Sequence, residues 1–335
     1  MKTETVFKSP FKDSPSLAFF SGKKILITGA NAYLGPKLAE ILSGEECTLV
    51  LHGHSKPQLS FPNSRAKIIL KGGDLSKPDA WETLIAGVDI VFHLAAHESK
   101  EFEPELDLEV NAFSTLRLLE LCRRQNLRSK IVFASSANLV GLAKRMPVDE
   151  TFQDDPQTIY AVHKLTSERY FSYYARQYGI LSAVLRLSNV YGPALSLPSA
   201  RRVAFNRMIE AAAEKGQMKL LKNRHCIRDY LFIDDAVSAF IAAASSDKTD
   251  GGRYYIVGND KGYSLEEFAK LIVLKVREKS GKEVTVSFDD ITELATAEFR
   301  NFVADSSRFR DLTGWHSKVS LEKGIENTLD FFLKA

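Results

Sequence analysis

Two residues in one predicted helix have the types and the spacing that acid/base chemistry needs. The aromatic-rich segment 158–178 predicts a helix, and it contains the run Tyr160-Ala-Val-His-Lys164. A spacing of four places the phenol of Tyr160 and the ammonium of Lys164 on one helical face. A phenol titrates near ~10 in water, and a nearby ammonium favours the phenolate, which brings proton exchange closer to neutral pH. Considered alone, Tyr160 also fits a buried helical tyrosine.

A phosphate-binding turn is predicted near the start of the chain. Residues 24–28 form an apolar, β-branched run typical of a buried strand. Gly29 ends this strand, and Gly35 opens a helical pattern that continues to Leu42. Such a turn leaves free N–H groups at the helix N-terminus, and together with the helix dipole they suit a pyrophosphate. The glycine spacing alone also fits a plain tight turn.

Strands and helices alternate from this turn to residue 192. The alternation predicts an α/β fold with a parallel, doubly wound Rossmann sheet that binds ligands at the carboxyl ends of its strands. The fourth predicted strand ends in Ala95 and Ala96, which would let a flat ligand lie close to the backbone or simply allow tight packing. The fifth ends in Ser135 and Ser136. The six predicted strands are residues 24–28, 47–52, 67–71, 89–96, 130–134 and 181–187.

The pattern changes after Pro193 to short strands among helices. We therefore predict an N-terminal arm over residues 1–22, a Rossmann domain over residues 23–193 and a smaller α/β substrate lobe over residues 194–335. A strand and a helix of the lobe can return to the first domain. The predicted lobe strands are residues 219–221, 254–257 and 284–288, and its predicted helices are residues 202–215, 234–245, 264–278 and 321–333.

The end of the second strand bears on cofactor choice. In dinucleotide folds an acid at this point hydrogen-bonds the ribose 2′-hydroxyl of NAD. Here the chain reads His52-Gly53-His54-Ser55-Lys56, without an acid. Serine, lysine and a protonated histidine match a 2′-phosphate better than a hydroxyl, so NADP is favoured over NAD. The alternative is a polar surface loop that holds the ribose weakly.

The bulk composition is that of an ordinary globular protein of 335 residues, with 44% hydrophobic and 26% charged residues. A net charge of +3 is too small to indicate nucleic acid or membrane partners. The three cysteines lack metal-ligand spacing and are interpreted as reduced core thiols. No apolar run approaches the ~18 residues of a membrane span, and the Leu17–Phe20 patch is too short for a signal-peptide core. We expect a cytoplasmic protein without a metal site.

Assembled in order, these segments closely resemble the extended short-chain dehydrogenase/reductases, the NAD(P)-dependent nucleotide-sugar epimerase/dehydratase group. No single motif is decisive, but the ordered set is specific and extends from residue 23 to residue 330. The matching stretches are Thr28-Gly29 to Gly35, Gly73-Asp74-Leu75, His93-Leu-Ala-Ala96, Asn111, Ser135-Ser136, Tyr160-x-x-x-Lys164, Arg186-Leu-Ser-Asn-Val-Tyr-Gly-Pro193 and Arg228-Asp-Tyr-Leu-Phe-Ile-Asp-Asp235.

The resemblance implies a role for each matching residue. Tyr160 is implied to be the catalytic acid/base, Lys164 to hold the nicotinamide ribose and lower the tyrosine pKa, and Ser136 to hydrogen-bond the same substrate oxygen. Residues implied to bind the cofactor are Gly29, Ala32, Tyr33, Leu34, Gly35, His52, His54, Ser55, Lys56, Asp74, Leu75, Leu94, Ala95, Ala96, Asn111, Tyr160 and Lys164.

Residues implied to contact the substrate are His97, Ser136, Asn189 and Arg228. Arg228 resembles the arginine that grips a substrate pyrophosphate, for which a bidentate guanidinium is suited. The alternative is an arginine paired with Asp229 or Asp234. Asn189 resembles an amide near the sugar phosphate.

Several departures from the family pattern bear on the reaction. Ala32 replaces the middle glycine of the turn, and Val140 replaces a usual tyrosine. Ala137-Asn138 stand where 4,6-dehydratases carry an acidic pair, which argues against dehydration. The loop from His97 to Asp107 is short, and Ala295 to Glu298 stand where the family has Arg-Pro-Gly-Asp.

The sequence therefore predicts an NAD(P)-dependent oxidoreductase or epimerase that transfers hydride at a sugar carbinol or ketone, at C4 of a nucleotide-linked sugar. A 4-ketoreductase and a 4-epimerase both fit, since an epimerase recycles a retained cofactor whereas a reductase exchanges it. The missing acid near His52 favours a reductase, because biosynthetic reductions commonly use NADPH. The alternatives are an NADP-dependent reductase of a small non-nucleotide ketone or alcohol, and a non-catalytic dinucleotide-binding sensor. Apolar residues on more than one face of the helices at 105–127 and 158–178 also predict a homodimer.

Overall fold

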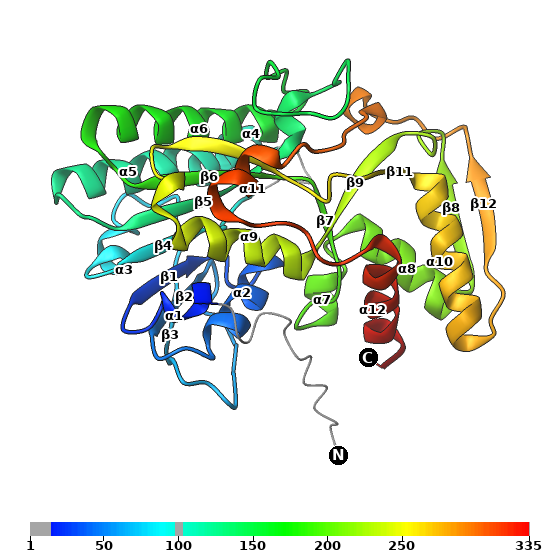
Figure 1. Ribbon diagram of the computed structural model, residues 1–335, viewed down its shortest axis with the longest axis horizontal. Helices are drawn as coiled ribbons and strands as arrows, with labels where there is room; N and C mark the ends of the chain where they lie inside the picture. Colours follow the sequence, from blue (N-terminus) through cyan, green and yellow to red (C-terminus); the bar gives the residue numbers. More distant parts are fainter. Residues whose placement is uncertain (1–14, 98–102, 335) are drawn as a thin grey trace.

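A parallel seven-stranded sheet forms the centre of the molecule (Figure 1). The computed structural model describes residues 15–97 and 103–334, so residues 1–14 of the predicted arm and residues 98–102 lie outside the described residues. The spatial order of the strands reverses at β1, which confirms the predicted doubly wound arrangement. In this order the strands are β3 (Lys67–Gly72), β2 (Thr48–Gly53), β1 (Lys24–Thr28), β4 (Ile90–His93), β5 (Lys130–Ser136), β6 (Ser182–Leu187) and β10 (Arg253–Val257).

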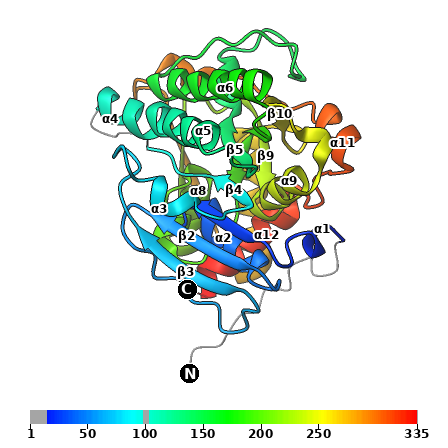
Figure 2. The same cartoon turned by 90° about the vertical axis from the view of Figure 1, so that its left-hand side faces the viewer.

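Helical layers cover both faces of the sheet, because apolar residues alternate sides along each buried strand. In β1, Leu26 packs into one layer, whereas Ile25 and Ile27 pack into the other. Figure 2 shows α5 and α6 side by side in the first layer. The first layer contains α3 (Glu82–Ile85), α5 (Ser114–Arg124) and α6 (Ile159–Tyr178), and the second contains α2 (Leu34–Leu42) and α9 (Ile233–Ser245).

The predicted helix 105–127 is present from Pro104 to Arg124, but its winding changes along its length. It consists of α4 (Pro104–Leu108), a π-helical turn over Glu109–Phe113, and α5, which ends at Arg124. The wide turn contains the buried Asn111, whose side-chain amide donates to the backbone oxygen of His97 at 2.7 Å and accepts from its N–H at 2.9 Å. These long-range bonds stabilise the extra residue in the turn, and π-turns of this kind often occur at functional sites.

The C-terminal part of the chain forms a smaller lobe, at the right of Figure 1. From this part, β10, α9 and α11 (Ser307–Thr313) pack with the main sheet, and α9 also contacts β7 and β9 of the lobe. The lobe contains a three-stranded sheet of β7 (Asn189–Tyr191), β9 (Ile227–Phe232) and β11 (Gly262–Ser264), and a pair of β8 (Gln217–Leu221) and β12 (Thr285–Asp289). Its helices are α7 (Leu197–Ala200), α8 (Ala204–Lys215), α10 (Leu265–Ser280) and α12 (Leu321–Lys334).

The end of the predicted N-terminal arm belongs to the packed domain. Leu17 in α1 (Pro15–Ala18) and Phe20 just after it are buried, and the centroid of the Phe20 ring lies 6.2 Å from that of Phe92 in β4. The patch that is too short for a signal-peptide core therefore contributes to the hydrophobic core. No helix within residues 15–97 and 103–334 has the length and apolar character that a membrane crossing requires.

The turn between β1 and α2 is built by two glycines that have no room for a side chain. Gly29 has a φ of +72°, in the left-handed region, and a Cβ there would lie 2.9 Å from the backbone nitrogen of Ala95. A Cβ on Gly35 would lie 2.4 Å from the backbone oxygen of Gly29. The turn is therefore packed against its own backbone and against the segment that follows β4.

We expect Gly35→Ala to lower the free energy of unfolding by about 1–3 kcal/mol, because a methyl group forced into a packed site must displace backbone. Chemical denaturation measures this change. Gly44→Ala is the matched control, because its Cβ would have only one neighbour, at 3.5 Å. A Gly35→Ala protein within ~0.5 kcal/mol of the original would contradict this close packing.

Candidate active site

The candidate active site lies at the carboxyl edge of the sheet, where β1 has β2 on one side and β4 on the other. In an open parallel sheet this reversal creates the crevice in which ligands bind. The Gly29–Gly35 turn follows β1, Leu94 to Ala96 follow β4, and Asp74 and Leu75 follow β3. The predicted cofactor residues therefore lie along one edge, although they come from separate parts of the chain.

Lys164 is buried beside Tyr160, as their spacing on α6 predicts. Its Nζ donates to the backbone oxygen of Ala134 in β5 at 2.8 Å. The same nitrogen lies 5.7 Å from the centroid of the Tyr160 ring and 4.5 Å from that of Phe133. Burial lowers the pKa of Lys164 to about 7, and the carboxylate of Glu168 opposes this lowering. The structure thus places a buried amine, whose charge depends on its surroundings, beside the ring of the candidate acid/base.

Ser136 lies at the carboxyl end of β5, two residues after the carbonyl that holds Lys164. Its Oγ accepts a hydrogen bond from the backbone N–H of Asn138 at 3.1 Å, which caps the 3₁₀ turn Ala137–Val140. The strand end therefore brings the serine close to the lysine that lies beside Tyr160. A phenol, an ammonium and a hydroxyl together can exchange a proton with one substrate oxygen.

A buried histidine holds the segment that follows β4. His93 Nδ1 lies 3.0 Å from Thr28 Oγ1, and its Nε2 lies 3.2 Å from Thr115 Oγ1. Thr28 Oγ1 in turn accepts from the backbone N–H groups of Leu94 and Ala95. Burial lowers the pKa of His93 to about 3, so its imidazole is neutral at pH 7. His93 fixes the edge of the crevice and carries no charge into it.

At the end of β2, the structure differs from the prediction in the charge of one residue, His52. His52 is buried, and burial lowers the pKa of its imidazole to about 4. The histidine is thus neutral at pH 7, which corrects the expectation that a protonated His52 could face a 2′-phosphate. His54, Ser55 and Lys56 are exposed, and the Asn31 side chain donates to the backbone oxygen of Ser55 at 2.7 Å.

Two residues of the glycine turn contact the C-terminal part of the chain. The Tyr33 hydroxyl donates to the backbone oxygen of Gly192 at 2.7 Å. The Ser199 hydroxyl donates to the backbone oxygen of Ala32 at 2.6 Å. The turn predicted to bind a pyrophosphate therefore also connects the Rossmann domain to the lobe.

Arg228 has no carboxylate partner among the contacts of the described residues. Its Nη2 donates to the backbone oxygen of Glu298 at 2.7 Å, and burial lowers the pKa of its guanidinium. Asp229 instead accepts from the hydroxyl of Ser188 and from backbone N–H groups, and Asp234 lies 3.5 Å from Lys37. The geometry therefore does not support the alternative in which Arg228 pairs with Asp229 or Asp234.

Arg300 joins this region and was not predicted from the sequence. Its guanidinium donates to Asn189 Oδ1 at 3.4 Å, and the Asn189 amide donates to the backbone oxygen of Asp229 at 3.0 Å. Arg300 also lines a cavity of about 20 Å³ together with Asn138, Gly141, Gln157, Thr158 and Ala297. The sequence signal that could have indicated Arg300 is its place shortly after Ala295, which stands where the family has an arginine.

His97 lies beside the same crevice. Its Nδ1 is 2.6 Å from Asp107 Oδ1, and Asn111 holds its backbone. The loop to Asp107 includes residues 98–102, which are outside the described residues.

The strand order places the predicted cofactor residue Lys56 and the predicted catalytic residue Ser136 apart from each other. Lys56 follows β2 and Ser136 ends β5, and the strands β1 and β4 lie between β2 and β5.

Comparison with known proteins agrees with this geometry. Residues 25–258 match the NAD dependent epimerase/dehydratase family. A UDP-glucose 4-epimerase of Mycolicibacterium smegmatis is 26% identical over 92% of this chain and 98% of that protein. UDP-glucose 4-epimerase of Thermotoga maritima superposes with a TM-score of 0.79 at 24% identity, over 93% of this chain and 99% of that one. UDP-glucuronic acid 4-epimerase of Bacillus cereus, solved with NAD, superposes with a TM-score of 0.75 at 26% identity over the same shares.

A Rossmann sheet with a tyrosine–lysine pair at its carboxyl edge defines the class of extended short-chain dehydrogenase/reductases. The chain belongs to the NAD dependent epimerase/dehydratase family within this class, and it is an enzyme.

Proposed function

We propose that the protein is an NAD(P)-dependent enzyme that transfers hydride at C4 of a nucleotide-linked sugar, as a 4-epimerase or a 4-ketoreductase. The observation that carries the proposal is the Lys164 ammonium, which is bound to the Ala134 carbonyl and lies beside the Tyr160 ring. The names of the relatives support the substrate class, because they act on UDP-glucose and UDP-glucuronic acid.

The crevice fits a nicotinamide dinucleotide, because the tight turn from Gly29 to Gly35 places the N-terminus of α2 at the carboxyl edge of β1, where a pyrophosphate can bind. A nicotinamide held there would supply the hydride acceptor and donor for the sugar carbon. Tyr160 as phenolate takes the proton of the sugar hydroxyl, and the hydroxyl of Ser136 donates a hydrogen bond to the same oxygen. The ammonium of Lys164 stabilises the phenolate, since opposite charges at short range favour the ionised form. In the reverse direction Tyr160 returns the proton.

The residues near Ser136 favour epimerisation or reduction over dehydration. Loss of water from a sugar needs an acid and a base next to the oxidised carbon. Ala137 and Asn138, which follow Ser136, provide neither an acidic nor a basic side chain. On the substrate side, Arg300 donates to Asn189, and Arg228 donates to the backbone of Glu298 in the segment that carries Arg300. Guanidinium groups suit the phosphates of a nucleotide sugar.

We expect Tyr160→Phe to abolish turnover of UDP-linked hexoses while leaving cofactor affinity nearly unchanged. Losing one general acid/base costs ~10²–10⁴ in rate, whereas the phenyl ring keeps its packing. Steady-state kinetics and cofactor titration measure the two effects. Tyr170→Phe, which changes another tyrosine of α6, is the control and should keep full activity. Turnover by Tyr160→Phe within about threefold of the original would exclude the assigned mechanism.

We further propose that NADP(H) is preferred over NAD(H). The preference depends on Ser55 and Lys56, which are exposed at the end of β2 where no carboxylate repels a 2′-phosphate. The buried, neutral His52 does not contribute a charge. A carboxylate cannot be introduced at Gly53 as a clean test, because a Cβ there would lie 2.5 Å from Asn31 Nδ2.

The unaltered protein should bind NADP at least tenfold more tightly than NAD, a gap of ~1.4 kcal/mol. Lys56→Ala should weaken NADP binding about tenfold and leave NAD binding unchanged, because only NADP has the phosphate that the ammonium contacts. Isothermal titration of both cofactors measures this. Lys67→Ala is the control, because Lys67 begins β3 and therefore lies at the opposite edge of the sheet from Lys56. Equal or tighter binding of NAD by the unaltered protein would disprove the preference.

We also propose a homodimer in which α5 and α6 pair with the same helices of a second copy. The α6 residues Val162 and Tyr173, three turns apart on one face, are 41% and 46% exposed, and Phe113 before α5 is 40% exposed. The two helices pack together in this chain and leave these apolar groups outward. A pair of such helices across a two-fold axis forms a four-helix interface.

Light scattering should show a dimer at micromolar concentration, and Tyr173→Glu should shift it to the monomer, because a buried unpaired carboxylate opposes association. Leu274→Glu provides the control, since Leu274 is 48% exposed but lies on α10 in the lobe. A monomeric unaltered protein, or a Leu274→Glu variant that dissociates equally, would contradict the proposed interface.

The cytoplasm is the proposed location. Cys47, Cys122 and Cys226 are all free thiols, and two of them are buried. Free cysteines of this kind are typical of proteins in a reducing compartment.

A further inference from the structure

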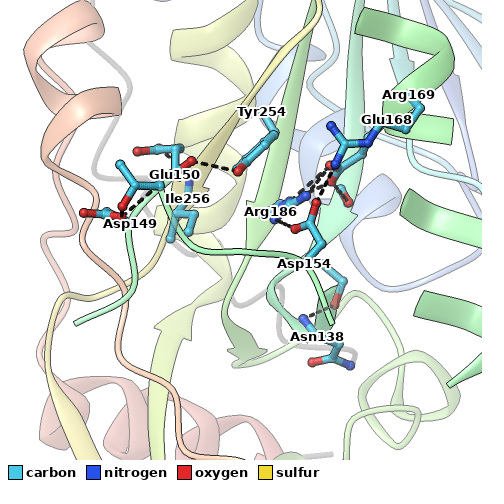
Figure 3. Close-up of polar contacts among 12 residues, drawn as sticks. Asn138, Asp149, Glu150, Asp154, Glu168, Arg169, Arg186, Tyr254 and Ile256 are labelled. Atoms are coloured by element: carbon cyan, nitrogen blue, oxygen red, sulfur yellow. Dashed lines mark hydrogen bonds and ion pairs between the residues drawn. The ribbon is translucent and has the colours of Figure 1, made fainter. Parts of the chain in front are cut away.

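An ionic network joins α6, β6 and the segment before α6 (Figure 3). Glu168 of α6 and Arg186 of β6 are 4% and 0% exposed. The guanidinium holds the carboxylate in a fork, with Nε 2.9 Å from Oε1 and Nη2 2.6 Å from Oε2. Its third nitrogen, Nη1, lies 2.6 Å from Oδ1 of Asp154, in the segment before α6. Two-pronged contacts of this kind fix both distance and orientation.

The ring of Tyr254 in β10 covers the guanidinium of Arg186. The guanidinium carbon lies 3.6 Å from the centroid of this ring. The Tyr254 hydroxyl donates to the backbone oxygen of Glu150 at 2.9 Å, which holds the ring over Arg186 (Figure 3). At its outer edge the network reaches the surface, where Asp154 binds the exposed Arg169. Between the buried Arg186 and Glu168, charges interact more strongly than they do at the surface.

The network connects to the catalytic residues through the spacing on α6. Tyr160, Lys164 and Glu168 follow one another at intervals of four residues, so they lie on one face. Lys164 binds the backbone oxygen of Ala134, and the hydroxyl of Ser135 donates to Glu168 Oε1. Successive turns of α6 are therefore attached to successive residues of β5, immediately before Ser136.

Glu168 is the carboxylate that follows Lys164 on the shared face of α6. Arg186 is a second buried cation, and it binds both Glu168 and Asp154. Asp154 also binds the exposed guanidinium of Arg169 on α6 at 2.8 Å, so two arginines share it. On the β4 side the neutral His93 provides no negative charge, and Tyr254 on β10 is a further titratable group in contact with the network. Removal of Glu168 would leave Lys164 and Arg186 buried with only the shared carboxylate of Asp154, which is costly.

We propose that Glu168, held by Arg186, is a positioning residue that keeps Lys164 charged and fixes the register of α6 on the end of β5. This proposal rests on the proposed function of Tyr160 and Lys164. It assigns to the network a role in catalysis beyond its contribution to stability.

The proposal predicts a specific pH dependence. Burial favours the neutral amine of Lys164, and the Glu168 carboxylate favours the ammonium. Glu168→Gln keeps the size and the hydrogen-bonding oxygen of the side chain but removes the charge, so Lys164 should lose its proton at a lower pH. With a midpoint lowered by about one pH unit from about 7, the activity deficit of the variant should grow about fivefold from pH 6 to pH 8.

The direct measurement is the ¹³C NMR titration of the lysine ε-carbons in labelled protein, with Lys164→Arg to assign the signal. Glu168→Gln should lower the Lys164 midpoint by at least about one pH unit. Asp154→Asn is the matched control, because it also removes a carboxylate from Arg186 but not the one next to Lys164. It should leave the midpoint within about 0.3 pH units of the original, even if both variants lower the melting temperature.

Two further variants keep the test decisive if Glu168→Gln does not fold. Glu168→Asp retains the charge and should restore the midpoint, while Ser135→Ala should reduce kcat without moving it. If the Lys164 midpoint is unchanged in Glu168→Gln, Glu168 has only a structural role. If Glu168→Gln does not fold, a lowered Lys164 midpoint in Ser135→Ala would lead to the same conclusion.

The titration needs no substrate. Failure to turn over nucleotide sugars would therefore refute the proposed function, whereas the NMR titration tests the role of Glu168 separately.

Discussion

The site depends on one interaction, the burial of the Lys164 ammonium against the carboxyl end of β5. A buried cation is stable only when nearby groups replace its water. Here the carbonyl of Ala134, the face of the Phe133 ring and the carboxylate of Glu168 provide this replacement. Because α6 can place Lys164 there in only one register, the same contact also sets the position of Tyr160 relative to Ser136.

The sheet provides a second constraint, because its order brings distant segments to one edge. The reversal at β1 places the glycine turn beside the end of β4. Thr28 and the neutral His93 then hold Leu94 and Ala95 by hydrogen bonds. In this arrangement the backbone at the edge is rigid and carries no side chain at Gly29 or Gly35. A flat ligand can therefore approach the backbone closely.

The substrate side is assembled from the lobe and is joined to the first domain by polar contacts. Tyr33 and Ser199 connect the glycine turn to the lobe. The buried Asp229 accepts hydrogen bonds from the backbone N–H groups of two further segments. Burial raises the pKa of Asp229 to about 6, so these hydrogen bonds hold a carboxylate that ionises reluctantly. Arg300 contacts Asn189 and lines the adjacent cavity, and the buried Arg228 holds the backbone of Glu298 in the same segment.

The sequence by itself determined the fold class, the strands from 24–28 to 181–187 to within a few residues, and the tyrosine–lysine pair. These features follow from local periodicity and from spacing within one helix, which the chain carries wherever it folds. Only the tertiary structure decided the π-turn at Asn111, the burial and neutrality of His52, the place of Arg300 and the Glu168–Arg186 pair. Each depends on groups from segments far apart in the chain, and burial, which sets their charge and partners, exists only once those segments pack.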